Sequence, residues 1–502
     1  MSDAVTSAAP AEAERSLTGT RGRSTFVAAA LCLGAAALAR ILSGIGQPLW
    51  LDEAWTGAII SQPDFGNFLH QVYLDVNAPL YYLVAYGWSQ VFGLSNLALR
   101  MPSILFGIAT PLLICRAAVP GLSREARLAW AVALASWMPG IWYATDARCY
   151  ALLLFLCTGQ MLAYADLMAK PAMRPALHWA IWSTLAILTH YHAGFLVLCQ
   201  GLLYLAMHRR AALRTWPAAL VFLPAAGWIA FHLPRLAAFA APDVAWYVRL
   251  EPSDLMGILG YFFSPPTVLF ALGALAVAAL AFGPRSLPAG QADMKGRLVL
   301  ASVLGSAVAA GCIIVALGFL RPSFAVRYLV PVAPAAMLGL IVAIAPFGKR
   351  WAAFWPAAMA ICLCGGLLLT WNIASRTRGY SFEAASADLA AAGTQRLVFA
   401  WDHPASAVLD RSQLAALGGF FFKRAGHPVA VDPIVLRPGD DASAAFLKAA
   451  AAAPHSAILW LYDRGVHDTA AITSPPAIAR TAPSWRCRNY GSSSIGVVAC
   501  SQ

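Results

Sequence analysis

Charge is scarce in this sequence. Only 12% of its 502 residues are Asp, Glu, Lys or Arg, whereas 60% are hydrophobic and the mean hydropathy is +0.65. A soluble globular chain has about twice that share of charged residues, so the soluble classes are excluded. The net charge is +12, but the basic residues are scattered in short loops between apolar runs. They therefore indicate membrane orientation and not a nucleic-acid-binding surface.

Two further absences bear on chemistry. The sequence contains no Asp-x-Asp pair, and its ten cysteines show no spacing typical of metal ligands. Eight of the cysteines lie in or beside apolar runs, where cysteine packs as a small apolar side chain. We therefore expect no cofactor, while the sequence leaves a metal requirement open. Internal repeats, which many transporters show, are not evident.

Long apolar runs are abundant. We interpret eleven of them as membrane-spanning helices, which predicts a polytopic α-helical membrane protein with its spanning domain at residues 25–372. Residues 1–24 are expected to form a disordered cytoplasmic terminus, because they are rich in small and polar side chains. The predicted spans are 25–43, 100–118, 128–143, 149–168, 177–190, 194–208, 216–233, 267–283, 298–319, 328–346 and 352–372.

The stretch Gln47–Leu99 contains no Lys or Arg but has four acidic residues. The basic clusters occupy linkers at the other ends of the spans, so the positive-inside rule places this stretch outside the membrane. Within it, Pro79–Phe92 is apolar but too short to span. We expect an interfacial helix there, inside a first external loop at residues 46–99. The predicted localisation is the cytoplasmic (inner) membrane, with the N-terminus cytoplasmic.

After Asn372 the composition changes. Residues 376–502 contain 12 Lys+Arg and 9 Asp+Glu and have no spanning run. Short apolar segments alternate with Ala-rich stretches, which predicts a small extracytoplasmic α/β domain at residues 373–502. Its two cysteines, Cys487 and Cys500, are predicted to pair across two terminal strands or a loop joining them, because an external compartment permits disulfides. The predicted strands are 396–401, 429–431, 457–462 and 495–499, and the predicted helices are 381–392 and 442–453.

Two adjacent carboxylates, Asp52 and Glu53, lie between Trp50 and Trp55 at the start of the external loop. Acidic side chains at a membrane boundary are costly to keep, so we interpret them first as functional. Either could accept a proton from an acceptor hydroxyl. The alternative is structural: Asp52 would cap a helix and Glu53 would solvate its first turn.

Three arginines are expected at the same membrane face: Arg148, Arg321 and Arg327. A guanidinium group presents fixed, permanently charged donors that suit a phosphate. A base beside a phosphate clamp at a membrane surface indicates group transfer from a lipid-linked phosphate donor. The alternatives are an ion pair of Arg148 with Asp146, and an Arg327 that snorkels at a helix end. Arg40, near the outer end of the first span, is expected to snorkel.

Four segments resemble a known family. Trp50-Leu51-Asp52-Glu53-Ala54-Trp55 is similar to the first-loop motif of GT-C superfamily membrane glycosyltransferases, in the branch with protein O-mannosyltransferases and lipid A aminoarabinose transferases. Three later segments resemble that branch's Asp-x-His-Pro-Pro-Leu-Tyr-Tyr, Tyr-Ser-Gln-Glu-Ala-Arg-x-Tyr and Arg-Tyr-Leu-x-Pro motifs. They are Asp75–Tyr82, Tyr143–Tyr150 and Arg327–Pro331, and the resemblance covers residues 25–346 in the right order.

The resemblance implies that Asp52 is the general base, with Glu53 as a second catalytic candidate, and that the donor is a polyprenyl-phosphate sugar. Asn77 and Ala78 replace the family's His and first Pro, so no role of that His carries over. Asp75 has a second interpretation, as a cap of the helix that starts near Pro79, and the two histidines named below could simply be solvated. The residues expected to bind substrate are Asp75, Asn77, Tyr82, Asp146, Arg148, Tyr150, His190, His192, Arg321, Arg327 and Tyr328.

We therefore expect an inverting glycosyltransferase that moves a hexosyl or pentosyl group from a polyprenyl-phosphate donor to a hydroxyl acceptor on the outer membrane face. Its partners would be the donor, an unidentified lipid, glycan or protein acceptor, and the bilayer, with no nucleic acid. Two other classes stay open: a transporter or lipid flippase, and a non-catalytic glycan-assembly protein. A transporter would place its charges at mid-span, whereas here nearly all of them lie at span ends.

Overall fold

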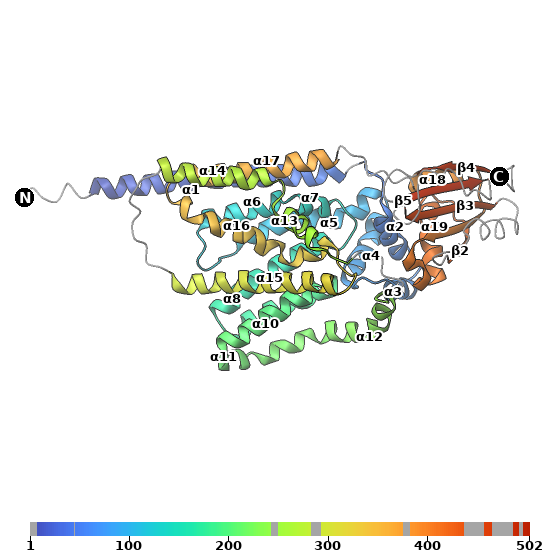
Figure 1. The fold of residues 1–502 in the computed structure, drawn as a ribbon, viewed down its shortest axis with the longest axis horizontal. Helices are drawn as coiled ribbons and strands as arrows, with labels where there is room; N and C mark the ends of the chain where they lie inside the picture. The colour runs from blue at the N-terminus through green and yellow to red at the C-terminus, as the bar shows by residue number, and fades with distance from the viewer. Residues whose placement is uncertain are drawn as a thin grey trace, which may run out of the picture.

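The computed structural model describes residues 8–44, 46–241, 249–282, 293–374, 382–435, 456–463, 485–490 and 495–501. A bundle of roughly aligned helices forms one part of the molecule, and a small sheet domain covers one end of it (Figure 1). The first-loop helices lie between the two parts. The predicted fold class, a helical membrane bundle with a small C-terminal α/β domain, is confirmed.

All the predicted spans coincide with helical segments. Among the described residues, seven segments are long and apolar enough to cross a membrane. There is an eighth if a bent pair of helices counts as one span; the pair consists of α13 (Leu255–Phe263, preceded by η2, Pro252–Asp254) and α14 (Pro266–Phe282). Helices α6 (Arg124–Ser136), α9 (Met173–Thr189) and α10 (Ala193–His208) have only 13, 17 and 16 residues. Eleven full spans are therefore not established. The bundle consists of α1 (Ala8–Gly44), α5 (Asn96–Arg116), α6 (Arg124–Ser136), α7 (Met138–Ala144), α8 (Tyr150–Ala169), α9 (Met173–Thr189), α10 (Ala193–His208), α11 (Arg210–Leu213), η1 (Trp216–Phe222), α12 (Leu223–Phe239), α14 (Pro266–Phe282), α15 (Met294–Leu320), η3 (Val326–Val332), α16 (Ala333–Gly348) and α17 (Phe354–Ala374).

Two expectations for the first helix are wrong. Helix α1 begins at Ala8, so residues 8–24 are helical where we expected disorder, while residues 1–7 lie outside the described part of the chain. Arg40 does not snorkel, because it is only 2% exposed. Its Nη1 donates to the carbonyl oxygen of Ala36 at 2.9 Å, and neighbouring helices enclose the rest of the side chain.

The external loop folds into three short helices, α2 (Leu51–Ile60), α3 (Phe65–Leu74) and α4 (Leu80–Phe92). Asp64 caps α3, since its carboxylate accepts from the backbone N–H of Asn67 at 2.8 Å. Helix α4 follows Pro79 and leaves Leu83, Val91 and Phe92 exposed, as an interfacial helix requires. Nearly every residue of α2 is buried, because α2 lies beneath α4 on one side and the sheet domain on another.

The C-terminal domain is a five-stranded sheet in the order β2-β1-β3-β5-β4. Strand β1 pairs in parallel with β2 and β3, while β5 pairs antiparallel with β3 and β4. The strands contain β-branched and aromatic residues that the pleated core buries. The strands are β1 (Arg396–Asp402), β2 (Ala430–Ile434), β3 (Ser456–Asp463), β4 (Arg486–Asn489) and β5 (Ile495–Ser501), and the helices are α18 (Phe382–Ala391), η4 (Pro404–Val408) and α19 (Arg411–Arg424).

The four predicted strands correspond to β1, β2, β3 and β5, and the helix expected at 381–392 corresponds to α18. The helix expected at 442–453 lies outside the described residues. The sequence missed β4, which is short and polar, and α19. The predicted disulfide between Cys487 and Cys500 is confirmed, and the two cysteines face each other across β4 and β5.

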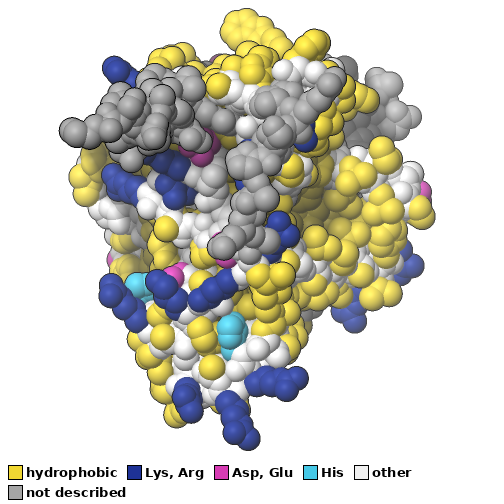
Figure 2. Space-filling model, turned by 90° about the vertical axis from the view of Figure 1, so that its left-hand side faces the viewer, with side chains coloured by type: hydrophobic (Ala, Val, Ile, Leu, Met, Phe, Trp, Pro, Cys, Tyr) yellow, Lys and Arg dark blue, Asp and Glu magenta, His cyan; other side chains and the backbone are white. Residues whose placement is uncertain are grey.

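Charge is unevenly distributed along the bundle. Helix α5 begins beside the sheet domain, where Arg424 of α19 donates to Asn96, and ends at Arg116. Arg116 and the basic linker that follows it therefore lie at the opposite end. Figure 2 views that end and shows many Lys and Arg side chains with few acidic ones. This distribution is what the positive-inside rule expects of a cytoplasmic face.

Candidate active site

Asp52 lies between two arginines that come from distant parts of the chain. Its Oδ2 is 3.9 Å from Nε of Arg148 and 3.8 Å from a terminal nitrogen of Arg327. The Asp52 side chain is 24% exposed, so it remains open to a ligand. The chain position of each residue explains the meeting. Asp52 is in the first turn of α2, Arg148 is in the turn between α7 and α8, and Arg327 is the second residue of η3.

Arg148 is fixed by groups of the first loop. Its Nη1 donates to the backbone carbonyl of Asp52 at 3.2 Å and lies 3.5 Å from the hydroxyls of Thr56 and Tyr82. Its Nε is buried and makes no hydrogen bond within the described part of the chain. A buried donor costs free energy unless it is satisfied, and the anionic group that this nitrogen faces is the Asp52 carboxylate at 3.9 Å. The expected alternative, an ion pair with Asp146, is not the pairing found, because the ion-pair partner of Arg148 is Asp52.

Asp75, Asn77 and Tyr82 form one hydrogen-bonded unit beside Arg148. Asp75 Oδ2 accepts from the hydroxyl of Tyr82 at 2.7 Å, and from Nδ2 and the backbone N–H of Asn77 at 2.8 and 3.1 Å. The side chain of Asp75 therefore does not cap α4, whose N-cap is Pro79. The unit places a second carboxylate, an amide and a phenol close to the Asp52 centre.

Aromatic and imidazole rings form another wall. The Arg327 guanidinium lies 5.8 Å from the ring centre of Tyr150, and His192 stacks on Tyr328 at 4.2 Å. His190 is 5.9 Å from Tyr150 and 5.1 Å from His192. Burial lowers the pKa of His192 to about 4. Burial also holds the pKa of His190 well below its usual range, and the neighbouring imidazole and the charges of Arg327 and Arg148 act in the same direction. Both imidazoles are therefore neutral near pH 7.

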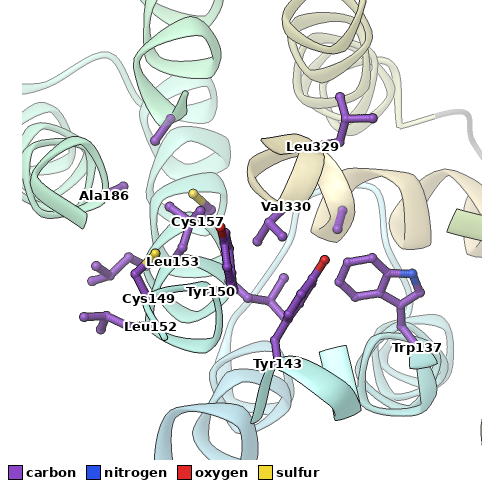
Figure 3. Close-up of a cluster of buried hydrophobic side chains, with 14 of the residues drawn as sticks. Trp137, Tyr143, Cys149, Tyr150, Leu152, Leu153, Cys157, Ala186, Leu329 and Val330 are labelled. Carbon is purple, nitrogen blue, oxygen red and sulfur yellow. The ribbon is translucent and has the colours of Figure 1, made fainter. Parts of the chain in front are cut away.

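Further buried aromatic rings pack against this wall. Tyr143 and Tyr150 lie 5.0 Å apart at their ring centres, and Trp137 meets Tyr143 edge-on at 6.3 Å (Figure 3). Figure 3 shows Val330 of η3 directly against this group. Buried rings beside the charged groups lower the local dielectric constant, which strengthens the electrostatic interactions of those groups.

Glu53 is fully buried, whereas we expected it to face the substrate as a catalytic candidate. It is 0% exposed, and both of its oxygens are occupied. Nε and Nη2 of Arg100 donate to them at 2.7 and 2.5 Å, and the backbone N–H groups of Ala147 and Trp50 donate at 2.8 and 3.2 Å. A carboxylate enclosed in this way cannot reach a substrate, so the expectation that Glu53 is catalytic is not supported. Instead it joins α2, α5 and the turn that holds Arg148.

Arg321 also differs from expectation. It is exposed at the C-terminal end of α15, and no hydrogen bond or ion pair of its side chain is found among the described residues. Asp146 lies in the turn before Arg148 and is only 2% exposed, so its side chain is not open to a ligand. The structure therefore brings together all the expected substrate-binding residues except these two.

Two residues that position the site were missed from the sequence. Arg100 is the partner of Glu53, and its Nη groups also hold three carbonyls of the chain before α2: those of Gly44, Gln47 and Pro48. Arg235 of α12 donates to the carbonyl of Leu74, beside Asp75, at 2.7 Å. A charge within a predicted apolar span must have a partner, and this signal could have found Arg100, the first residue of the predicted span 100–118. Arg235 lies just beyond the predicted span 216–233, so no such signal existed for it in the sequence.

The described residues contain no group of three or more His, Cys, Asp or Glu side chains placed to hold a metal ion. Taken together, the centre offers one accessible carboxylate, two guanidinium groups and a wall of neutral rings. A carboxylate can accept a proton, and paired guanidinium groups can hold a phosphate.

Comparison with known proteins gives fold-level relatives only. No protein-family model and no curated protein matches the chain. Among solved structures, the crystal structure of ArnT from Cupriavidus metallidurans bound to undecaprenyl phosphate aligns with a TM-score of 0.56 at 13% identity, covering 94% of this chain and 97% of that chain. ArnT from the same organism in the apo state aligns with a TM-score of 0.57 at 12% identity over the same shares. The chain therefore shares its overall fold with ArnT, which agrees with the fold that the resemblance of its motifs implied.

Proposed function

We propose that this chain is an inverting glycosyltransferase that moves a sugar from a polyprenyl-phosphate donor to a hydroxyl acceptor on the outer face of the cytoplasmic membrane. The observation that carries the proposal is the position of Asp52, with Arg148 and Arg327 both within 4 Å of its carboxylate. A proton acceptor and an anion clamp in one half-open site are the two elements that transfer from a sugar phosphate requires.

This geometry supports the following reaction. Asp52 accepts the proton of the acceptor hydroxyl, while the hydroxyl oxygen attacks the anomeric carbon from the side opposite the phosphate. The bond between that carbon and the phosphate oxygen breaks, and its electron pair leaves on the lipid phosphate. Arg148 and Arg327 stabilise the charge that develops there, which is usually the largest electrostatic contribution to catalysis. The long separations of Asp52 from both arginines leave its oxygens accessible to the acceptor.

The other residues of the site serve binding. Neutral His190 and His192 can donate or accept hydrogen bonds to sugar hydroxyls without adding charge. The faces of Tyr150 and Tyr328 offer flat apolar surface for a sugar ring. The Asp75 unit lies on the first-loop side of Arg148, where it would contact the acceptor.

Three observations support a polyprenyl-phosphate donor and a site on the outer face of the membrane. The fold is shared with ArnT, which was crystallised with undecaprenyl phosphate. The disulfide between Cys487 and Cys500 suits an oxidising compartment for the sheet domain. The basic end of the bundle lies opposite that domain (Figure 2), which suits a cytoplasmic location for that end.

The test is a donor assay with purified full-length protein and a panel of polyprenyl-phosphate sugars, in the presence of a membrane extract as the source of acceptor. We expect one of these donors to be consumed with release of the polyprenyl phosphate and appearance of labelled sugar on an acceptor. Consumption of a sugar nucleotide in place of every lipid-linked donor would contradict the proposal.

A further inference from the structure

A cavity of about 880 Å³, lined mostly by polar and charged residues, opens between the first external loop and the sheet domain. The ends of α2 and α4 and the start of α5 line one side, and α18 and α19 line the other. The cavity borders Ser61, at the opposite end of α2 from Asp52, about 14 Å along the helix. It is therefore a separate place from the centre formed by Asp52, Arg148 and Arg327.

The cavity wall is rich in hydrogen-bonding groups. The first loop contributes the amides of Gln62 and Gln90 and the hydroxyl of Ser89, and α5 contributes Asn96. Asn96 also donates across the junction between the helical bundle and the sheet domain, to Glu383 at 3.2 Å. A fixed set of amides and hydroxyls suits a ligand with several polar oxygens.

The charge of the cavity wall is positive. Arg424 forms an ion pair with Glu383 and also donates to Asn96 at 2.5 Å, so its charge is balanced. Lys423 is exposed, and within the described part of the chain its ammonium group donates to the backbone carbonyl of Ser61 and to no carboxylate. One positive charge at the cavity is therefore left for a ligand.

An exposed apolar surface adjoins the cavity. Val91 and Phe92, at the end of α4, are 74% and 56% exposed, and Leu97 at the start of α5 is 47% exposed. They directly follow or flank the cavity residues Ser89, Gln90 and Asn96 in the chain. A polar, positively charged hollow beside exposed apolar side chains matches the two halves of an anionic amphiphile.

We propose that this cavity binds the phosphate-bearing headgroup of an anionic membrane lipid, with the acyl chains lying against Val91, Phe92 and Leu97. The lipid thereby bridges the first loop and the sheet domain at the surface of the bilayer. This site does not depend on the proposed transferase activity. The same headgroup chemistry could come from a soluble phosphate, which the experiment must distinguish.

The experiment is native mass spectrometry of the full-length protein in detergent, titrated with phosphatidylglycerol or phosphatidylcholine. We expect tighter binding of the anionic lipid, and for Lys423→Gln a loss of about fivefold in affinity for it, with binding of phosphatidylcholine unchanged. Val91→Gln should weaken binding of both lipids. Arg486→Gln is the matched control, because Arg486 is an exposed cation of the same domain on β4, away from the cavity.

Three results would overturn the proposal. The first is equal affinity of the wild-type protein for both lipids. The second is an unchanged preference for phosphatidylglycerol in Lys423→Gln, with Arg486→Gln as the comparison. The third is displacement of the bound lipid by millimolar inorganic phosphate, which would assign the cavity to a soluble anion. An unchanged melting temperature of Lys423→Gln, which is exposed, shows that the variant remains folded.

Discussion

The carboxylate of Asp52 and the guanidinium of Arg327 lie 3.8 Å apart, although most of the bundle's sequence separates the two residues along the chain. Arg148 approaches the same carboxylate oxygen at 3.9 Å. At these distances the two cations face the carboxylate without occupying its lone pairs in short hydrogen bonds. A proton acceptor and a phosphate clamp are thereby combined, and the following predictions test each part.

The arginine clamp should need guanidinium geometry. Arg148→Lys and Arg327→Lys should each weaken binding of a polyprenyl-phosphate donor by about 10- to 100-fold, because hydrogen bonds to charged groups are strong and an ammonium group lacks the planar fork. Arg321→Ala is the control, since Arg321 is exposed and, among the described residues, the arginines paired with Asp52 are Arg148 and Arg327. Binding can be measured by titration calorimetry. Equal donor affinity in all three variants would assign the arginines to structure.

The pair of Glu53 and Arg100 should be essential to folding. Glu53→Gln removes one partner of a fully buried ion pair, which typically costs about 3–5 kcal/mol. The double variant Glu53→Met/Arg100→Met should recover part of that loss, because it leaves no unpaired buried charge. Asp388→Asn, which breaks the exposed pair with Arg488, is the control. Melting temperatures in detergent check the order, and a fully stable Glu53→Gln protein would contradict it.

The buried histidines should make the protein sensitive to acid. His192 has a pKa of about 4 when folded and about 6.5 when unfolded, so the unfolded chain binds the proton first. Stability from this residue is complete above pH 6.5 and falls as the pH drops from 6.5 toward 4. His192→Gln should flatten the change in melting temperature over that range. Replacement of exposed His427 should not, and an identical slope in the His192 variant would refute the explanation.

The disulfide should stabilise the sheet domain modestly. Cys487 and Cys500 are 13 residues apart, so the bond closes a short loop and its removal should cost about 2–3 kcal/mol. The double variant Cys487→Ser/Cys500→Ser should therefore unfold at lower temperature, while Cys312→Ser, an exposed thiol in α15, should not. A peptide map without reducing agent should show the two cysteines linked. Both recovered as free thiols would disprove the bond.

Much of this fold could be predicted because hydrophobicity determines it locally. The apolar runs coincide with the helices, and the short apolar segments of the tail coincide with four of the five strands. Strand β4 escaped prediction because Arg486–Asn489 is polar and is held by pairing with β5 and by the disulfide. Helix α19 escaped because its apolar residues face two partners, the sheet and α2.

The site was harder to predict, because its two acidic neighbours are alike in sequence. Asp52 and Glu53 differ only in the helix face on which they lie: Asp52 faces the arginines, and Glu53 faces Arg100. That difference depends on how α2 packs. Gly57, one turn further along, permits α19 to approach so closely that a Cβ there would lie 2.2 Å from Phe420. Close packing between segments that are far apart in the sequence cannot be inferred from the residue pattern of either segment.

The central claim is that Asp52 is the base, and turnover by Asp52→Asn tests it most directly. The amide keeps the size of the side chain but cannot accept the proton of the acceptor hydroxyl. With the purified variant and the donor identified by the panel, transfer should fall by about 10²–10⁴-fold or more, while donor binding and melting temperature stay within the wild-type range. Near-normal transfer by Asp52→Asn would remove the residue from the mechanism and leave Asp75 as the remaining accessible carboxylate at the site.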